Sequence, residues 1–226
     1  MDANLKPPPD RLYGRARGHS LRPRQVVLLD TLLPRLSWPA VPFTAPPAEL
    51  WIEVGAGSFE HAEAIARANP DIGLIACEVF ENGVASLLSR LAPGDADPAT
   101  CPVPSNLRAY RDDARGLLRG LPDQSVARLF LMFPDPWPKA RHAKRRFVHP
   151  DMLAEVARLM PAGSEWRIAS DDPTHQNWVN TVFAAQHHFT SVVQTSVRPD
   201  GWPATRYEAK ALRAGRTPIY WVFRRV

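Results

Sequence analysis

The sequence predicts an α/β protein built on a parallel sheet that is covered by helices on both faces. From residue 50 onward, apolar strand-like segments alternate with helical segments, and the first strand-like segment runs into the glycine-containing turn EVGAG at 53–57. Parallel strands that are buried on both faces have near-continuous apolar sequences, and their alternation with helices indicates such a sheet. With 226 residues, the chain is long enough for one domain of this kind and short for two.

Seven segments are expected to form strands, and seven to form helices. The strand-like segments are apolar and rich in β-branched and aromatic residues, and they lie at 50–54, 72–79, 107–110, 126–133, 166–170, 189–197 and 218–223. The helical segments have apolar residues at helical spacing. They lie at 22–36, 58–68, 81–91, 114–121, 151–160 and 175–186, with a short helix after Arg206.

The chain divides into a flexible basic arm over residues 1–20 and a single domain over residues 21–226. Three consecutive prolines at 7–9 favour an extended arm. No run approaches the roughly 20 apolar residues that span a bilayer, and the N-terminus lacks the apolar stretch of a signal peptide. We therefore expect a soluble, cytoplasmic protein without a membrane segment.

The sequence predicts neither a disulfide framework nor a metal site. There are only two cysteines, Cys77 and Cys101, and they form no CxxC pair. The histidines show no spacing that would bring them together with carboxylates on one face. Surface or packing roles are the expected ones for these side chains.

Positive charge is concentrated in three segments. Residues 1–25, 139–146 and 206–225 together hold 17 of the 28 Lys and Arg residues and only 3 of the 23 Asp and Glu residues, which leaves an acidic remainder. Basic segments on an acidic body are typical of polyanion-binding enzymes, because phosphate contacts supply most sequence-independent affinity for nucleic acids. Charge alone leaves the alternative that these segments only keep the protein soluble.

Carboxylates surround the predicted glycine turn. Gly55 and Gly57 lie between the first strand and its helix, at the sheet edge where α/β proteins bind nucleotides. Glu53 and Glu78 lie at the ends of the first two strands, and Asp113 follows the third. In these places they can accept hydrogen bonds from an amine, ribose hydroxyls and an adenine amino group.

A nicotinamide dehydrogenase is the main alternative for this turn, because Glu78 lies about 20 residues beyond the glycines. However, Glu60 stands where the dinucleotide pattern needs a glycine, and carboxylates would repel a pyrophosphate. We therefore favour S-adenosylmethionine, whose sulfonium is cationic, as the ligand.

The most informative stretch is FPDPWPKARHAKRRF at 133–147, directly after the fourth strand. Three prolines stiffen this loop and hold Asp135 and Trp137 beside the predicted nucleotide pocket. One rigidly presented acid followed by five basic residues is an arrangement expected of a catalytic loop next to a phosphate backbone. The alternative is a structural turn followed by a solvated basic run.

Several segments together resemble the bacterial tRNA (guanine-N7)-methyltransferases, from about Tyr13 to the end of the chain. They are YGRARGHSLRPRQ, EVGAG, ACEV, FPDPWPKARHAKRR, ASDD and TRYEAKALRAG. The resemblance implies a Rossmann-like class I methyltransferase fold with a seven-stranded, mostly parallel sheet whose last, inserted strand is antiparallel. It also implies methyl transfer from S-adenosyl-L-methionine to N7 of a guanosine in the tRNA variable loop.

The resemblance assigns roles to individual positions. Asp135 is implied as the catalytic residue and as a cofactor contact, together with Glu53, Gly55, Gly57, Glu78 and Asp113. Substrate contacts are implied for Lys139, Asp171, Thr205, Arg206, Tyr207 and Glu208, and RNA contacts for Arg141, His142, Ala143, Lys144, Arg145 and Arg146. One departure is Phe59, which occupies the place where the family commonly has a third glycine.

Some of these roles have structural competitors. Trp137 can stack on the target base or pack in the core, and Glu208 can cap its own helix. The arginines of the arm and its continuation are expected to contact tRNA phosphates, namely Arg11, Arg15, Arg17, Arg22 and Arg24.

Two other functions are weighed against the methylation of tRNA. A methyltransferase for small molecules or proteins has little use for three basic segments. A non-catalytic RNA-binding protein has no need of the four carboxylates of the predicted cofactor site, Glu53, Glu78, Asp113 and Asp135. The resemblance implies that no obligate protein partner is needed, so we expect a monomer or a homodimer.

Overall fold

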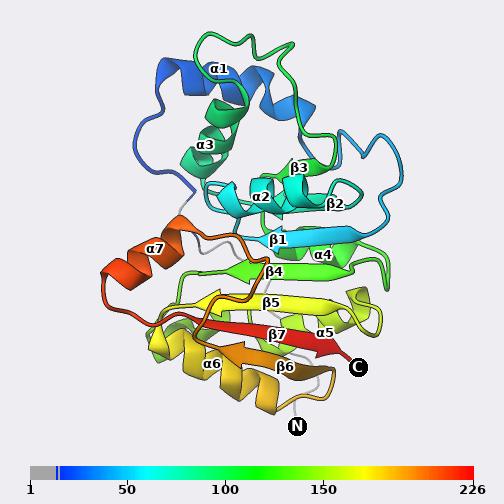
Figure 1. The fold of residues 1–226 in the computed structure, drawn as a ribbon, viewed down its shortest axis with the longest axis vertical. Helices are drawn as coiled ribbons and strands as arrows, with labels where there is room; N and C mark the ends of the chain where they lie inside the picture. Colours follow the sequence, from blue (N-terminus) through cyan, green and yellow to red (C-terminus); the bar gives the residue numbers. More distant parts are fainter. Residues whose placement is uncertain (1–13, 15) are drawn as a thin grey trace.

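The computed structural model describes Gly14 and residues 16–226, which form a seven-stranded sheet between two layers of helices (Figure 1). The strand order is β3-β2-β1-β4-β5-β7-β6. The strands are β1 (Leu50–Val54), β2 (Gly73–Cys77), β3 (Leu107–Tyr110), β4 (Arg128–Met132), β5 (Glu165–Ser170), β6 (Phe189–Thr195) and β7 (Ile219–Arg225). The neighbouring strands from β3 to β5 pair in parallel, whereas β7 is antiparallel to both β5 and β6. The expected fold class is confirmed.

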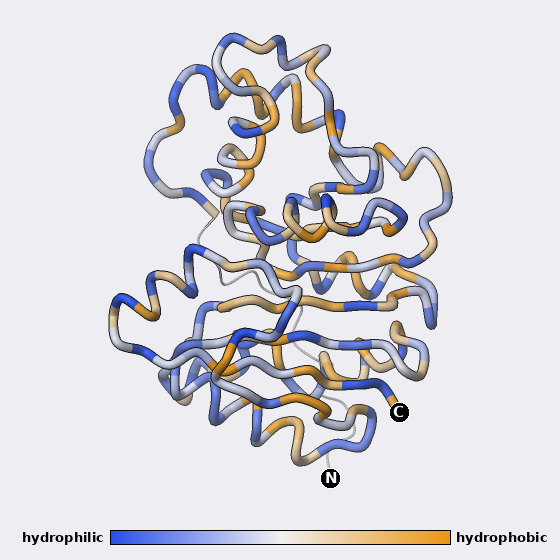
Figure 2. Tube along the Cα trace, viewed as in Figure 1, coloured by the Kyte–Doolittle hydropathy of each residue, from blue (hydrophilic) through white to orange (hydrophobic). Residues whose placement is uncertain are grey.

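Alternate strand residues point into two separate apolar clusters. Trp51 and Leu74 belong to the cluster beneath α1 (Pro23–Thr31), α2 (Glu60–Ala68) and α3 (Glu81–Leu91). Ile52 and Ile75 belong to the cluster beneath α4 (Ala114–Gly120), α5 (Pro150–Leu159) and α6 (Pro173–Ala184). The period of two places successive side chains on opposite faces, and the apolar strand interiors are visible in Figure 2. Helices thus cover both faces, as the sequence predicts.

The first helix is shorter than predicted. The spacing of apolar residues indicates a helix over 22–36, but α1 ends at Thr31 and a 3-10 turn, η1 (Leu33–Arg35), follows. Pro34 explains the difference, because it has no backbone N–H to donate and its ring clashes with the preceding helical turn. Leu32, Leu33 and Leu36 are buried all the same, so their apolar spacing reflects the core and not one continuous helix.

The basic arm is described only in part. Arg11 and Arg15 lie outside the described residues. Residues 16–19 hydrogen bond to the beginning of α3: the Ala16 carbonyl accepts from the Glu81 amide at 2.9 Å, and the Asn82 side chain bonds to the Gly18 amide and the His19 carbonyl. The Arg24 guanidinium donates to the carbonyls of Ala92 and Ala96, so this arginine holds the loop after α3.

The parallel strands all direct their carboxyl ends to one edge of the sheet. In Figure 1 the arrowheads of β1, β4 and β5 point to the same side of the molecule, and α7 (Arg206–Arg213) lies at that side. The loops that follow these strands hold the glycine turn and Asp135. Within the described part of the chain, no helix is long and apolar enough to cross a membrane.

A buried histidine in α6 makes stability depend on pH. His175 is 1% exposed, and neither ring nitrogen has a hydrogen-bond partner among the described residues. Burial, helped by repulsion from Arg146, lowers the pKa of His175 from 6.5 to about 4, while Asp172 opposes this shift. The unfolded chain therefore binds the proton first. The stabilisation from the neutral ring is complete above pH 6.5 and is lost as the pH falls toward 4.

We expect His175→Leu to remove this acid sensitivity. Between pH 7.5 and 5, the free energy of unfolding of the unaltered chain should fall by about 2 kcal/mol more than that of the variant. Urea titrations at the two pH values measure this difference. The exposed Asn177 of the same helix provides the control, since it carries no titratable group and Asn177→Leu should keep the pH dependence of the parent. Equal pH dependence in His175→Leu and the parent would contradict the assignment.

Candidate active site

A hollow of about 540 Å³ lies at the carboxyl ends of β1, β2 and β4. Its wall includes five of the six predicted cofactor residues, which are Gly55, Gly57, Glu78, Asp113 and Asp135. The rest of the wall includes Tyr207 of α7 and four apolar side chains, which are Leu131, Met132, Phe133 and Phe147. The fold therefore brings together the five predicted cofactor residues, which span 80 positions from Gly55 to Asp135, as the parallel sheet predicts.

The glycine turn packs directly against α3. Gly55 and Gly57 have φ angles of +73° and +57°, which belong to the left-handed region that glycine adopts without strain. A Cβ atom on Gly83 of α3 would lie 2.0 Å from the Gly57 carbonyl oxygen, so only glycine fits there. Sequence analysis missed Gly83. The signal was a lone glycine inside a helical pattern, which usually has a packing reason.

Glu78 is fixed by backbone amides at the end of β2. Its two carboxylate oxygens accept from the Gly57 amide at 2.6 Å and from the Phe80 amide at 2.7 Å. Burial raises the pKa of Glu78, although these hydrogen bonds act in the opposite direction. Each oxygen retains a lone pair, so the carboxylate can accept further hydrogen bonds from a ligand's hydroxyl groups.

Asp113 is held at the beginning of α4. It caps the helix by accepting from the Arg115 amide at 3.0 Å, and its other oxygen accepts from the Arg115 guanidinium at 2.7 Å. Because Asp113 and Arg115 both line the hollow, they present a paired carboxylate and cation to anything bound there.

Glu53 lies beside a second, smaller hollow. Its carboxylate is buried and lies 3.0 Å from Nδ1 of the buried His61 in α2. This hollow measures about 20 Å³ and shares Gly55, Met132 and Tyr207 with the larger one. A Cβ atom on Gly57 would lie 3.2 Å from the Tyr207 ring, so this ring packs against the glycine turn. The sequence predicted Glu53 as a cofactor contact and Tyr207 as a substrate contact, and it gave no role to His61.

Phe59 occupies the position at which the family commonly has a third glycine. Its φ angle of +64° is in the left-handed region, where a glycine would be unstrained and an ordinary side chain costs about 1–2 kcal/mol. The Phe59 side chain is fully buried in the core beneath α1 to α3 and lines neither hollow. The Phe59 side chain therefore contributes to core packing and to neither hollow wall.

The loop after β4 presents Asp135 to the larger hollow. Asp135 is exposed and has no hydrogen bond or ion pair within the described part of the chain. The loop is held from inside by Arg146, which donates to the carbonyls of Pro136 and Trp137 at 3.2 and 3.0 Å and lies over the Trp178 ring. Rigid loop geometry thus leaves one free carboxylate at the mouth of the hollow.

Trp137 already has neighbours on its ring. The Arg145 guanidinium lies 4.8 Å from the ring centre, and the His142 ring meets it edge-on at 5.8 Å. Trp137 lines the hollow and is partly exposed, so a base can stack there only if it shares or displaces these contacts. Its role toward a substrate stays a prediction.

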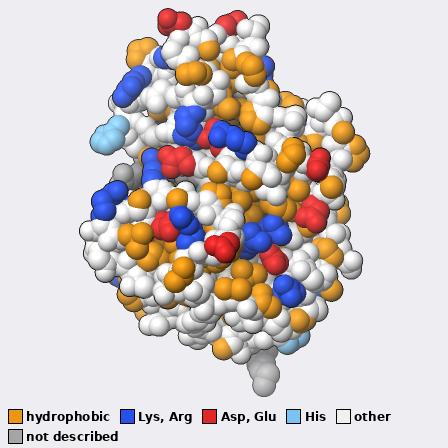
Figure 3. All heavy atoms as spheres, viewed as in Figure 1, with side chains coloured by type: hydrophobic (Ala, Val, Ile, Leu, Met, Phe, Trp, Pro, Cys, Tyr) orange, Lys and Arg blue, Asp and Glu red, His pale blue; other side chains and the backbone are white. Residues whose placement is uncertain are grey.

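The predicted RNA-binding run does not face one way. Arg141 and Lys144 of η2 (Ala140–Arg145) are exposed, whereas Arg146 is only 6% exposed and its guanidinium is used inside the chain. Burial also lowers the pKa of Arg146. Spacing alone did not separate the inward arginine from the outward ones. Figure 3 shows that on the drawn face Lys and Arg side chains lie among Asp and Glu side chains.

The predicted substrate residues lie on three elements. Lys139 is exposed before η2, and Asp171 accepts from Arg216 at 2.5 Å after β5. Thr205 and Glu208 form a capping box at the start of α7. The buried Glu208 carboxylate also accepts from the Tyr220 hydroxyl at 2.7 Å and from Arg198 at 3.0 Å. Burial and the hydrogen bond to Glu208 raise the pKa of Tyr220.

Glu208 therefore has the local capping role that the sequence offered as its alternative. The exposed Arg206 lies over the Tyr207 ring. Substrate binding by these side chains stays a prediction.

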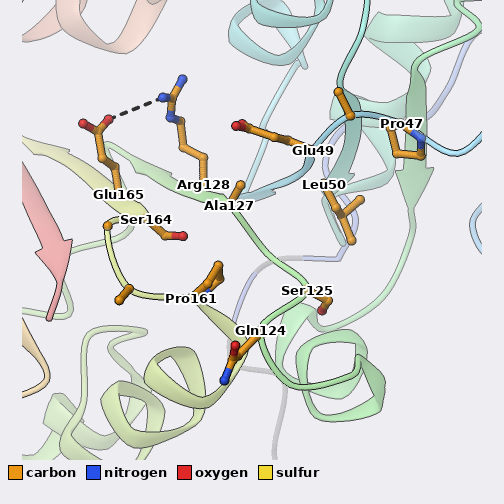
Figure 4. A pocket seen from close by; sticks show the side chains of 13 residues that line it. Pro47, Glu49, Leu50, Gln124, Ser125, Ala127, Arg128, Pro161, Ser164 and Glu165 are labelled. Carbon is orange, nitrogen blue, oxygen red and sulfur yellow. Dashed lines mark ion pairs between the residues drawn. The ribbon is translucent and has the colours of Figure 1, made fainter.

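Another hollow, of about 730 Å³, lies at the opposite edge of the sheet (Figure 4). Arg128 and Glu165 form an ion pair in its wall at 3.5 Å, with Glu49 nearby. Its wall contains no predicted site residue, and it lies at the amino ends of β1, β4 and β5. Ligands of open α/β sheets bind at the carboxyl ends, so the 540 Å³ hollow with the acidic wall is the candidate active site.

Comparisons with known proteins decide the family. Residues 47–220 match the family model described as "Putative methyltransferase". A tRNA (guanine-N(7)-)-methyltransferase of Granulibacter bethesdensis is 60% identical over 220 residues, with 97% of both chains covered. The enzyme of the same name from Paramagnetospirillum magneticum is 42% identical, with 95% of this chain and 92% of that one covered. The chain belongs to the tRNA (guanine-N(7)-)-methyltransferase family.

Solved structures support the fold of this methyltransferase. The 16S rRNA methyltransferase KamB has a TM-score of 0.54 at 15% identity, covering 80% of this chain and 88% of that one. A 16S rRNA (adenine(1408)-N(1))-methyltransferase variant from Catenulisporales acidiphilia, with its cosubstrate SAM, has a TM-score of 0.52 at 15% identity, covering 80% and 87%. At such identities the likeness is one of fold, and it agrees with the class I methyltransferase architecture predicted from the sequence.

Proposed function

We propose that this protein transfers the methyl group of S-adenosyl-L-methionine to N7 of a guanosine in the variable loop of tRNA, giving 7-methylguanosine. The observation that carries this proposal is the 60% identity to a tRNA (guanine-N(7)-)-methyltransferase over 97% of both chains. The acidic hollow at the carboxyl ends of the strands supports it, because it offers carboxylates to a cationic ligand.

The residues in the two hollows fit S-adenosylmethionine. Glu78 would accept hydrogen bonds from the ribose hydroxyls, Asp113 from the adenine amino group and Glu53 from the amine of the methionine part. The left-handed glycines let the backbone approach the ligand closely. A pyrophosphate would be repelled by the same carboxylates, which disfavours a dinucleotide.

Catalysis rests on positioning and electrostatics. The bound cofactor supplies an electrophilic methyl group on a sulfonium. N7 of guanine has a free lone pair, so the protein needs no base to activate it, and the guanine ring gains positive charge in the transition state. The Asp135 carboxylate at the mouth of the hollow stabilises this charge and accepts hydrogen bonds from the N1 and N2 donors of guanine.

The exposed cations of η2 should bind the phosphate backbone. We expect Arg141→Ser combined with Lys144→Ser to weaken tRNA binding several-fold and to reduce the slope of log affinity against log salt by about one to two, since each phosphate contact contributes roughly 0.7–0.9. Binding of S-adenosylhomocysteine should not change. Filter binding at several salt concentrations measures both quantities for tRNA.

Arg67 offers a matched control, because it is exposed in the last turn of α2, far along the chain from η2. Arg67→Ser should keep the affinity and the salt slope of the parent. An η2 double variant with both quantities unchanged would remove these residues from the RNA interface.

The experiment that tests the function is methyl transfer from labelled S-adenosylmethionine to unmodified tRNA, followed by nucleoside analysis. Labelled 7-methylguanosine is the expected product. Label in another nucleoside would contradict the target atom. A methyltransferase for small molecules or proteins would leave tRNA unlabelled, and a non-catalytic RNA-binding protein would bind tRNA without transfer. We also infer a cytoplasmic monomer or homodimer that acts without an obligate protein partner.

A further inference from the structure

We propose that His61 is a positioning residue that aims the Glu53 carboxylate at the amino-acid end of the cofactor. This inference rests on the proposed function, because it concerns the binding of S-adenosylmethionine. It adds a residue to which neither the sequence motifs nor the resemblance gives a role.

The Glu53 carboxylate depends on a single hydrogen-bond donor. The Glu53 side chain is 2% exposed, and His61 Nδ1, at 3.0 Å from Oε2, is the only hydrogen-bond partner of the carboxylate within the described residues. An ionised carboxylate can only accept, so Nδ1 bears the hydrogen. A buried charge without a donor would be costly, and one donor therefore decides how this carboxylate lies.

The His61 side chain is itself held in place by its surroundings. Its side chain is 4% exposed in the first turn of α2, and its ring meets the Phe130 ring edge-on, with centres 5.2 Å apart. Phe130 belongs to the central strand β4. The imidazole is thus a rigid link from the middle of the sheet to the carboxylate.

Glu53 and His61 lie together at one end of the site. Glu53 and His61 line the small hollow, whereas Glu78 and Asp113 line the large one. The two hollows meet at Gly55, Met132 and Tyr207. With Glu78 and Asp113 at the adenosine end, Glu53 is left to accept from the ligand's ammonium group, and His61 orients the Glu53 carboxylate.

Two nucleosides separate this role from a structural one. S-adenosylhomocysteine has the amino-acid group, and 5′-methylthioadenosine lacks it. His61→Phe keeps a ring against Phe130 but removes the donor. We expect it to lower the affinity for S-adenosylhomocysteine about tenfold and to change the affinity for methylthioadenosine less than about twofold. His61→Gln, which retains a donor, should recover part of the loss. Calorimetry on the full chain measures all the affinities.

The outcomes are distinct. Equal losses for both nucleosides, or no loss for either, would overturn the role of His61. If His61→Phe does not fold, His61→Met provides the same comparison, because it also lacks a donor for the carboxylate. An unaltered chain that binds neither nucleoside would contradict the proposed function itself, and that result precedes any test of His61.

Discussion

Replacing Gly83 with alanine is expected to destroy the cofactor site. The added Cβ atom would lie 2.0 Å from the Gly57 carbonyl oxygen and 2.9 Å from its carbon, and both are backbone atoms that no rotamer change can move. The turn must shift, and it would lose the hydrogen bond from the Gly57 amide to Glu78. We expect the affinity for S-adenosylhomocysteine to fall by roughly one to two orders of magnitude and stability by about 1–3 kcal/mol.

A second helical glycine makes this experiment specific. Gly116 in α4 has only the Tyr110 hydroxyl within reach of an added Cβ, at an ordinary 3.7 Å. Gly116→Ala should therefore stabilise the protein by about 0.5–1 kcal/mol, as alanine normally does in a helix, and should leave cofactor binding intact. Calorimetry and urea unfolding of the two variants measure the contrast. Normal cofactor affinity in Gly83→Ala would show that the turn tolerates displacement.

Removing the charge of Asp135 should reduce the methylation rate far more than tRNA binding. Asp135→Asn preserves the size of the side chain and the proline-stiffened loop but cannot balance the positive charge that develops on guanine. We expect kcat to fall about 100- to 1000-fold, the range for losing one preorganised electrostatic contact in an active site. The Kd for tRNA should change little, because phosphate contacts dominate RNA affinity.

Single-turnover assays at saturating cofactor, with parallel tRNA binding, separate the two effects. Asp151→Asn is a suitable control, since Asp151 is an exposed acid at the beginning of α5. It should leave kcat unchanged. Near-normal turnover in Asp135→Asn would mean that the charge of this residue is not part of the mechanism.

Much of the fold was predictable because its rules are local. Parallel strands such as β1 and β2 have near-continuous apolar sequences, and the strand-like segments match the observed strands to within a few residues. The break after Thr31 was missed because the buried leucines continue their helical spacing through Pro34. In that segment the core determines which residues are apolar, and proline determines the backbone.

The candidate site was predictable where its carboxylate residues lie at or just after the carboxyl end of a strand. Glu78, Asp113 and Asp135 come together in one hollow because parallel strands end at one edge. Side-chain direction was not predictable from the sequence. Arg146 belongs to the same basic run as the exposed Lys144, yet its guanidinium points inward to the loop carbonyls. His61 was missed because its contact with Glu53 depends on how α2 packs beside β1. Gly83 left a local signal, a lone glycine in a helical segment, but the sequence does not show that it packs against Gly57.

The position of β7 has a consequence for biosynthesis. This strand is made last of the seven, yet it lies between β5 and β6, with β5 and β6 each pairing with it. Until β7 has paired with them, β5 has an unpaired edge and β6 has no neighbour in the sheet. Exposed edges of this kind invite pairing with other chains. A partly folded chain in which β7 has not yet paired is therefore expected to be the form most prone to aggregation.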